Sequence, residues 1–597
     1  MIPDILDFAS LEAGYRSGAF TPLDVAQETL LRIASGDPAV WITRRADDEI
    51  LADARALMAR GPGGVLWGLP FAVKDNIDVA DLPTTAACPE FAYTPDVDAF
   101  AVARLKEAGA LLIGKTNLDQ FATGLNGTRS PYGAPRCVFN SDYVSGGSSS
   151  GSAVAVALGQ VAFALGTDTA GSGRVPAAFN NIVGVKPTRG LVSTSGVVPA
   201  CRSLDCVTVF ATTVGDADCV RRAMQAEDAA DAYSRAMTPR ALSLSQFHFG
   251  VLSKPHREFF GDAETEALYD GAIARLEALG GVAAEIDYAP FRDCAALLYG
   301  GPWVAERLAA IKLFFAQHAE AIEPTVRGII AGAQGKTAVD AFEGAYALEA
   351  FRKATAREWA KMDVLLLPTA PTIYSIDALR RAPVALNSNL GLYTNFVNLL
   401  DCSAVAIPAG FRGDGLPAGV TLVAPAFADD ALAALADRLH RAAPSGMGRD
   451  RTAPMPTESA LAPQNQSLVP IVVVGAHLSG MPLNGQLIDG GGVLLRTCRT
   501  APDYRLFVLP GATPPKPGLL RDPGFAGEGL EAEIWGLPPA AFGAFVAAIP
   551  APLGVGKITL DDGSAESGFL CESHALRLAA EITDLGGWRA YIASRST

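Results

Sequence analysis

Apolar residues recur at helical spacing in several segments of the chain, and short apolar runs follow them. Thr21 and Pro22 predict the start of a helix through residues 23–33, because threonine caps helix N-termini and proline suits the first turn. Residues 99–109 predict a further helix, and residues 110–114 a strand. The same alternation recurs at 151–166, 264–288 and 363–369. Alternating helices and strands predict an α/β fold with a mixed or mostly parallel sheet covered by helices.

This periodicity breaks at 442–468, where proline, serine, glycine and polar residues dominate. We interpret that segment as a linker, so that residues 1–441 form one domain and residues 469–597 another. Short apolar runs between glycine and proline turns favour an α+β or barrel-like fold for the second domain. Strands are predicted there at 470–476, 491–497, 504–511, 531–537 and 567–572.

Composition narrows the class of protein. The 597 residues are 49% hydrophobic and 19% charged, and the net charge of −15 argues against nucleic acid or an anionic membrane as a partner. The N-terminus carries Asp4 and Asp7 and no basic segment, so it does not read as a signal peptide. The most apolar long run, 153–166, is shorter than the roughly 20 residues that a bilayer requires. We expect a soluble cytoplasmic protein.

The cysteines predict neither a metal cage nor a disulfide framework, because they are scattered, odd in number and never spaced as CxxC. They stand at positions 88, 137, 201, 206, 219, 294, 402, 498 and 571. We therefore expect no metal and no cofactor.

The stretch GTDTAGSGR at 166–174 places Ser172 among small residues, where a sharp backbone turn could expose a nucleophile. A serine nucleophile needs a base, but no histidine precedes His248, and neither the GxSxG nor the SxxK pattern fits. Two other stretches supply candidates: VKDN at 73–76 and the serine-rich VSGGSSSGSA at 144–153.

Together these stretches resemble the amidase signature family, whose loop reads close to GGSSGGSA and is followed by GTDxGGSxRxPA and GxKPT. This chain has GGSSSGSA, then GTDTAGSGRVPA, then GVKPT at 184–188. A single glycine- and serine-rich loop is more often a turn, and a single lysine after a strand is usually solvated. Three matching segments in the family's order make coincidence improbable.

The resemblance implies a catalytic unit of Lys74, a cis-Ser at Ser148 and the nucleophile Ser172. Lysine has a pKa of about 10.4 in water, but burial in an apolar setting disfavours its charged form, and a neutral lysine accepts a proton. The implied proton path runs from Ser172 through Ser148 to Lys74. The implied oxyanion hole consists of the backbone N–H groups of Thr169, Ala170, Gly171 and Ser172. Asp168 and Arg174 are expected to brace this loop.

Further segments resemble one branch of the family, the allophanate hydrolases. They are 117–133, 193–206 and 299–307, together with Ala170 in place of the commoner glycine. The resemblance implies allophanate as substrate, with Arg307 on its carboxylate, Tyr299 nearby and the backbone carbonyl of Gly124 as a further contact. Tyr299 and Arg307 share a face if that segment is one helix. Alternatively, Arg307 pairs with a structural carboxylate and Tyr299 belongs to the core.

For the second domain, the resemblance implies a γ-glutamyl-cyclotransferase-like fold that assists decarboxylation of N-carboxycarbamate, the product left after the first ammonia is released. His477, Glu533 and Lys557 are candidate residues for this step, although residues of these types more often have a structural role. We also expect a homodimer and functional coupling to a biotin-dependent urea carboxylase in urea degradation.

Three alternatives remain open. The chain could be an amidase for another small amide, in which case Arg307→Ala would leave its true activity intact. The second domain could be a non-catalytic module for binding or dimerisation. A role within a glutamine-dependent tRNA amidotransferase is disfavoured by the acidity and by the second domain.

Overall fold

The computed structural model describes residues 2–240, 242, 244, 246–457, 461, 468–511 and 514–595. The chain forms two compact units, Met1–Thr238 with Leu244–Pro463, and Pro239–Ser243 with Gln464–Thr597. Part of the predicted linker, 458–460 and 462–467, lies outside the described residues. An earlier part of it packs on the first unit, because the Asn181 side chain donates to the carbonyls of Ser445 and Gly448 at 2.8 and 3.0 Å.

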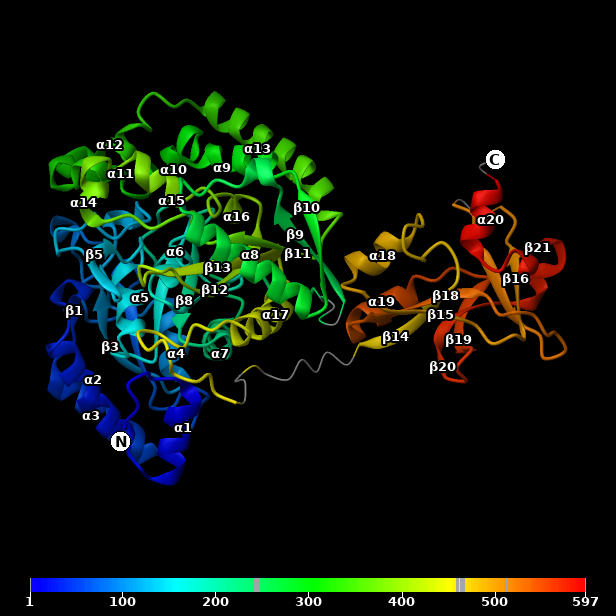
Figure 1. The fold of residues 1–597 in the computed structure, drawn as a ribbon, viewed down its shortest axis with the longest axis horizontal. Coiled ribbons are helices and arrows are strands. Elements are labelled where there is room, and N and C mark those ends of the chain that lie inside the picture. Colours follow the sequence, from blue (N-terminus) through cyan, green and yellow to red (C-terminus); the bar gives the residue numbers. More distant parts are fainter. Residues whose placement is uncertain are drawn as a thin grey trace. The chain divides into compact units, whose positions relative to one another are not determined.

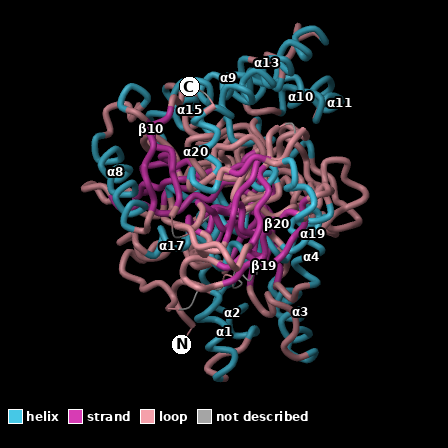
Figure 2. Tube along the Cα trace, turned by 90° about the vertical axis from the view of Figure 1, so that its right-hand side faces the viewer, coloured by secondary structure: helices cyan, strands magenta, loops and turns pink. Residues whose placement is uncertain are grey.

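A large mixed sheet forms the centre of the first unit, which confirms the predicted α/β fold. Its strand order is β1 (Trp41–Arg44), β3 (Leu111–Thr116), β2 (Pro70–Lys74), β6 (Phe163–Asp168), β8 (Cys206–Ala211), β7 (Val183–Lys186), β12 (Cys402–Phe411), β13 (Pro417–Pro425), β11 (Val364–Pro368), β9 (Phe247–Leu252) and β10 (Gly281–Ile286). Strands β3, β2 and β6 are parallel, as are β11, β9 and β10, and the other neighbours pair antiparallel. The last strand, β10, lies at one edge of the sheet beside α8 (Figure 2).

Helices surround this sheet, and α9 to α13 gather on one side of the unit (Figure 1). The helices are α1 (Phe8–Ser17), α2 (Pro22–Ala34), α3 (Asp47–Arg60), α4 (Phe100–Glu107), α5 (Ser150–Ala157), α6 (Val175–Phe179), α7 (Val214–Met224), α8 (Ala263–Ala278), α9 (Ala289–Gly300), α10 (Trp303–Ala310), α11 (Lys312–His318), α12 (Pro324–Ala331), α13 (Ala338–Trp359), α14 (Ile376–Arg381), α15 (Ala385–Leu390), α16 (Phe396–Leu399) and α17 (Asp429–Arg441). A small hairpin, β4 (Arg136–Cys137) and β5 (Asn140–Val144), completes the unit. The start of α2 follows the prediction, because Thr21 accepts a hydrogen bond from the Asp24 N–H.

The parallel strands β2 and β6 bring distant segments of the chain to one edge of the sheet. Phe71 pairs with Phe163 and Val73 with Leu165, so both strands end at the same edge. Helix α5 packs against this part of the sheet, and all of its residues are buried. That burial explains why the segment is apolar around its whole circumference. Within the described part of the chain, no helix is long and apolar enough to cross a membrane.

The second unit is built on two further sheets, which confirms the predicted α+β class. The larger has the order β15 (Val493–Arg499), β18 (Glu531–Leu537), β14 (Val469–Val473), β20 (Ala565–Cys571) and β19 (Leu553–Thr559). The smaller consists of β17 (Pro517–Arg521), β16 (Tyr504–Val508) and β21 (Ala580–Glu581). The helices are α18 (Asn484–Asp489), α19 (Pro539–Ala547) and α20 (Trp588–Ser594). The five strands expected from the sequence correspond to β14, β15, β16, β18 and β20.

Candidate active site

Lys74 is the last residue of β2, and its side chain is fully buried. Its Nζ lies 2.8 Å from Ser148 Oγ and 2.7 Å from Thr167 Oγ1. Thr167 belongs to β6, the parallel neighbour of β2, so the sheet itself holds the Lys74 amine beside the start of the 166–174 loop. The structure thus brings together Lys74 and Ser148, which stand 74 residues apart in the sequence.

Burial lowers the pKa of Lys74 from its usual 10.5 to about 7. The nearby carboxylates of Asp119, Asp205 and Asp168 oppose this shift, and the positive charge of Arg307 adds to it. A large fraction of Lys74 is therefore neutral near pH 7, where an unperturbed lysine would be almost wholly charged. Neutral Lys74 can accept a proton from the Ser148 hydroxyl.

The loop before α5 presents Ser148 to Lys74. The Gly147–Ser148 peptide bond is cis, and the Ser148 carbonyl accepts a hydrogen bond from the Asp119 N–H at 3.0 Å. Asp119 is buried and also accepts backbone hydrogen bonds from Asn126, Gly127 and Arg129. A Cβ at Gly147 would stand 2.1 Å from Asp119 Oδ2, so only glycine fits at that position.

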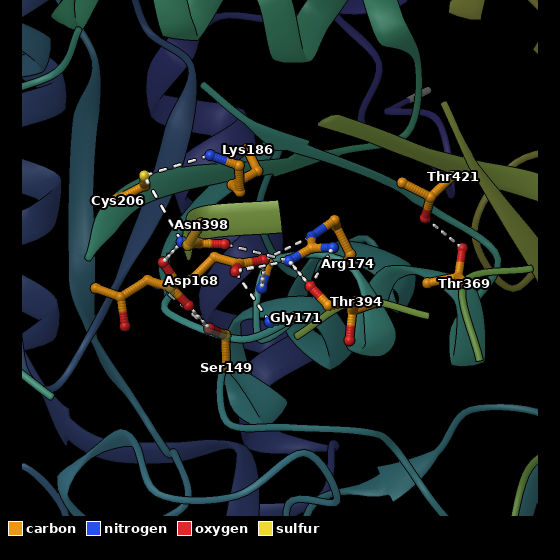
Figure 3. Close-up of polar contacts among 12 residues, drawn as sticks. Ser149, Asp168, Gly171, Arg174, Lys186, Cys206, Thr369, Thr394, Asn398 and Thr421 are labelled. Carbon is orange, nitrogen blue, oxygen red and sulfur yellow. Dashed lines mark hydrogen bonds and ion pairs between the residues drawn. The ribbon is translucent and has the colours of Figure 1, made fainter. Parts of the chain in front are cut away.

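Ser172 is buried in the loop that follows β6. Asp168, at the end of β6, contacts Gly171 and Arg174 of this loop (Figure 3). Asp168 accepts hydrogen bonds from the Gly171 and Gly173 N–H groups at 2.9 and 3.0 Å. It also forms a two-point ion pair with Arg174, at 2.9 and 3.0 Å, and both side chains are fully buried. These contacts confirm that Asp168 and Arg174 brace the loop.

One predicted donor of the oxyanion hole, the Gly171 N–H, already makes a hydrogen bond within the protein. Gly171 has a φ of +144°, and a Cβ there would stand 2.5 Å from Thr394 Oγ1. Because its N–H already donates to Asp168, Gly171 could serve an oxyanion only by sharing that hydrogen bond. The assignment of Thr169, Ala170, Gly171 and Ser172 as donors stays a prediction.

Tyr299 and Arg307 lie on two helices, so the expectation of a shared helix face is wrong. Helix α9 ends at Gly300, and α10 begins at Trp303. The two side chains nevertheless meet through packing: Arg307 Nη2 lies 3.2 Å from Tyr299 Oη, and the guanidinium carbon lies 5.1 Å from the centroid of the ring.

Arg307 is 2% exposed and forms no ion pair with a carboxylate among the described residues. Its Nη1 donates to Thr123 Oγ1 at 3.0 Å, and its Nε has no hydrogen-bond partner. Gly124, whose carbonyl is predicted to contact the substrate, follows Thr123 directly. The structure therefore contradicts the alternative in which Arg307 pairs with a structural carboxylate. A buried arginine without an ion-paired carboxylate is suited to an anionic ligand, because burial of a cation is costly unless an anion pairs with it.

In the second unit, His477 lines a cavity of about 640 Å³. Its ring stacks on Phe569 and meets Phe545 edge-on, and its Nε2 lies 3.0 Å from Gln486 Oε1. Burial lowers the pKa of His477, and Lys516 on the same cavity adds to the shift. The ring is thus mostly neutral at pH 7.

The other two candidates of this unit do not line the cavity. Glu533 accepts hydrogen bonds from the Ser479 N–H and from Trp535, and it pairs with Arg589 at 2.7 Å. It therefore anchors the loop that carries His477. Lys557 lies on β19 with an exposed side chain. The roles of all three residues stay predictions.

Several residues of the two candidate sites were not predicted from the sequence. They are Thr123, Thr167, Asp119 and Asp205 in the first unit, and Gln486 and Lys516 in the second. Thr167 lies within the GTD stretch, Asp119 and Thr123 lie within the 117–133 segment, and Asp205 lies within the 193–206 segment, so the resemblance covered their positions without giving them roles. Gln486 and Lys516 carried no such signal, and only tertiary contacts show what they touch.

Both units of the chain match known protein families. Residues 24–433 match the model of the family described as Amidase, and residues 469–593 match that of the allophanate hydrolase C-terminal domain. The solved allophanate hydrolase of Kluyveromyces lactis is 39% identical, with a TM-score of 0.72, and the match covers 97% of this chain and 98% of that one.

Among curated relatives, the urea amidolyase of Saccharomyces cerevisiae is 44% identical over 570 residues. That match covers 92% of this chain but 31% of the relative, so the chain spans about a third of its length. The urea amidolyase of Lachancea kluyveri is likewise 44% identical, over 88% of this chain and 30% of its own length. Since the Amidase match extends over more than half of the residues, the chain belongs to the amidase family.

Proposed function

We propose that this chain hydrolyses allophanate, with Lys74, Ser148 and Ser172 as the catalytic residues of the first step. Allophanate carries a carboxylate at one end and a urea-like amide at the other. The observation that carries the proposal is the buried Arg307 without a carboxylate partner, in the same buried site as Lys74 and Ser148. A site for an uncharged amide would have no use for such a cation.

The first half of the reaction forms an acyl-enzyme. Ser172 Oγ attacks the carbonyl carbon of the terminal amide while its proton passes to Ser148 Oγ, and the proton of Ser148 passes to Lys74 Nζ. The C–N bond then breaks as the relay runs backwards: Lys74 returns a proton to Ser148, and Ser148 passes one proton to the leaving nitrogen, which departs as ammonia. The 2.8 Å contact between Lys74 and Ser148 supports this relay.

The second half releases the acyl group. A water molecule attacks the ester and gives one proton to Ser148, which passes its own proton to Lys74. The C–O bond to Ser172 then breaks, and the relay returns one proton to Ser172 Oγ. The product is N-carboxycarbamate, which carries a carboxylate at both ends. Loss of one carbon dioxide gives carbamate, which decomposes to a second ammonia and a second carbon dioxide. Each allophanate thus yields two molecules of ammonia.

Replacing Arg307 with alanine is expected to raise KM for allophanate by about 100-fold, because a buried charge-assisted pair is lost. The measurement is ammonia release from allophanate and from biuret, a neutral analogue in which an amide replaces the carboxylate. Arg307→Lys tests the geometry: lysine keeps the charge but cannot form two parallel hydrogen bonds, so partial activity is expected.

The control is Arg451→Ala, because Arg451 is an exposed cation that stacks on Phe139 and Phe411, neither of which is a residue of the site. An equal loss on allophanate and biuret in Arg307→Ala would contradict the role of Arg307 as the carboxylate contact. Unchanged activity on another small amide, with none on allophanate in the wild type, would favour an amidase of different specificity.

We further propose that the second unit assists decarboxylation of N-carboxycarbamate in its His477 cavity. Lys516 supplies a cation for a carboxylate, and Gln486 orients the His477 ring. Glu533 acts through Ser479 and the loop rather than on the substrate. Lys557, exposed on β19, has no part in this step.

His477→Ala is expected to leave the first ammonia unaffected and to delay the second. Early in the reaction, the ratio of ammonia released to allophanate consumed should fall from two toward one, because the intermediate accumulates. Lys557→Ala is the matched control and should keep a ratio of two. A ratio of two from the first time points in His477→Ala would show that the intermediate decays unaided and would favour a binding or dimerisation role for the second unit.

The partners follow from the same chemistry. The urea amidolyase relatives support coupling to a biotin-dependent urea carboxylase, an activity that would supply allophanate from urea. We also propose a homodimer, which the exposed side chains of Val339, Phe342 and Tyr346 along α13 support. The cytoplasmic location and the domain boundaries at 442–468 stay predictions from the sequence.

A further inference from the structure

Asp205 is a buried carboxylate next to the catalytic residues that the relay itself does not use. It directly precedes β8, whose first residue, Cys206, pairs with Asp168 at the end of β6. It is 4% exposed and forms no ion pair among the described residues. A carboxylate buried in this way is stabilised by the hydrogen bonds that it accepts.

Those hydrogen bonds come from two segments. From one side, the Ala200 N–H donates to Oδ2 at 2.8 Å and the Cys201 N–H lies 3.2 Å from both oxygens. From the other side, the Thr169 hydroxyl donates to Oδ1. Asp205 therefore joins the loop 169–174, which carries Ser172 and is called the nucleophile loop below, to the loop before β8.

The bond to Thr169 fixes the part of the loop that precedes Ser172. The loop has two carboxylate anchors: Asp168 holds Gly171 and Gly173 through their N–H groups, whereas Asp205 holds Thr169 through its side chain. The hydrogen bond to Asp205 uses the Thr169 side chain, so the peptide N–H of Thr169 takes no part in it. Preorganised N–H donors are worth most when their direction is fixed before the reaction.

Asp205 also takes part in the charge balance around Lys74. The nearby carboxylates of Asp119, Asp205 and Asp168 raise the pKa of Lys74, and the cation of Arg307 lowers it. Burial raises the pKa of Asp205 to about 6, while its hydrogen bonds and Arg307 oppose the shift. The Cys201 thiol also lies near Asp205, and burial raises the pKa of that thiol, so it stays uncharged. Arg202 shares a small cavity with Asp205 and is itself exposed.

We propose that Asp205 is a positioning residue for the amide hydrolysis, because it anchors the Thr169 end of the nucleophile loop and adds a buried negative charge near Lys74. The proposal rests on the Ser172 chemistry described above. It adds a residue that acts on the geometry of the oxyanion donors and on the proton affinity of Lys74, without touching the substrate.

Two substitutions separate the hydrogen bond from the charge. Thr169→Val removes the hydroxyl and keeps both the shape of the side chain and the charge of Asp205. Thr169→Ser restores a hydroxyl and is the matched rescue variant. Asp205→Asn keeps the shape and an acceptor for Thr169 but removes the charge, and its amide nitrogen cannot accept the Ala200 N–H.

The experiment measures kcat and KM against pH with allophanate, or with whichever small amide the wild type hydrolyses. Thr169→Val should lower kcat by about 10- to 100-fold with KM within about threefold of the wild type, as expected for a misdirected oxyanion donor. The acid limb of its pH profile, where activity falls as Lys74 becomes protonated, should not move. Thr169→Ser should recover most of kcat. In Asp205→Asn, the acid limb should shift to lower pH by about half a unit or more, because loss of a nearby negative charge lowers the pKa of Lys74.

Wild-type kcat in Thr169→Val, or an acid limb that stays in place in folded Asp205→Asn, would overturn the proposal. Thermal melting establishes which variants are folded, and if Asp205→Asn does not fold, the Thr169 pair decides the outcome by itself. A wild type that hydrolyses allophanate with all variants equally active refutes the role of Asp205 alone. A wild type without activity on any small amide refutes the proposed function instead.

Discussion

Replacing Ser172 with alanine should reduce ammonia release from allophanate by about 10⁴-fold or more, because removal of a nucleophile in serine hydrolases leaves only binding and oxyanion stabilisation. The buried loop that carries Ser172 is held by Asp168 and Arg174 and not by the serine hydroxyl, so the fold should persist. The measurement is kcat for ammonia release, together with the melting temperature of the variant.

Ser150→Ala is a matched control. Ser150 is a buried serine of the neighbouring serine-rich loop, and its hydroxyl makes only a long contact of 3.5 Å to the Asn117 carbonyl. That variant should keep kcat within about threefold of the wild type. Residual activity of Ser172→Ala near the wild-type value would identify another nucleophile.

Replacing Lys74 with methionine should lower kcat by about 10³-fold or more, because the relay then lacks its final proton acceptor. Methionine retains the length of the side chain and suits a fully buried position. Lys74→Arg is the informative companion, because arginine keeps the positive charge but does not give up its proton near neutral pH. Both variants should be inactive if a neutral amine is the base, whereas an active Lys74→Arg would mean that only a cation is needed.

The wild-type pH profile follows from the same group. The competent form of Lys74 is the neutral one, and its pKa is lowered to about 7. Therefore kcat/KM should rise with pH up to about 7 and level off above it. The same depression means that the unfolded chain binds more protons than the native one between about pH 7 and 10.5, so this group makes stability increase with pH across that window.

The catalytic segments could be predicted from the sequence because they are local. Lys74 ends an apolar strand, and Ser148 and Ser172 lie in glycine-rich loops whose order along the chain resembles the amidase signature. The pairing of β2 with β6 explains why three separated stretches converge. The start of α2 and the five strands expected in the second unit were likewise predictable, since the Thr21 cap and the glycine and proline turns are local features.

The roles of the supporting residues could not be predicted, although Asp119 and Asp205 lie within segments that carry the family resemblance. Asp119 and Asp205 are two acidic residues among 63, and only their burial and backbone hydrogen bonds single them out. Tyr299 and Arg307 were expected on one helix, yet the chain turns between Gly300 and Trp303 and tertiary packing joins them. Lys516 directly precedes β17, and only the folded structure shows that it lines the His477 cavity.

The most direct test of the account is the specificity constant of the purified wild-type chain for ammonia release from allophanate, compared with biuret, malonamate and glutamine. Neutral Lys74 can activate the nucleophile, and the buried Arg307 forms no ion pair among the described residues. We therefore expect allophanate to be the preferred substrate, with malonamate next because it keeps the carboxylate. Hydrolysis of glutamine with none of allophanate would contradict the account.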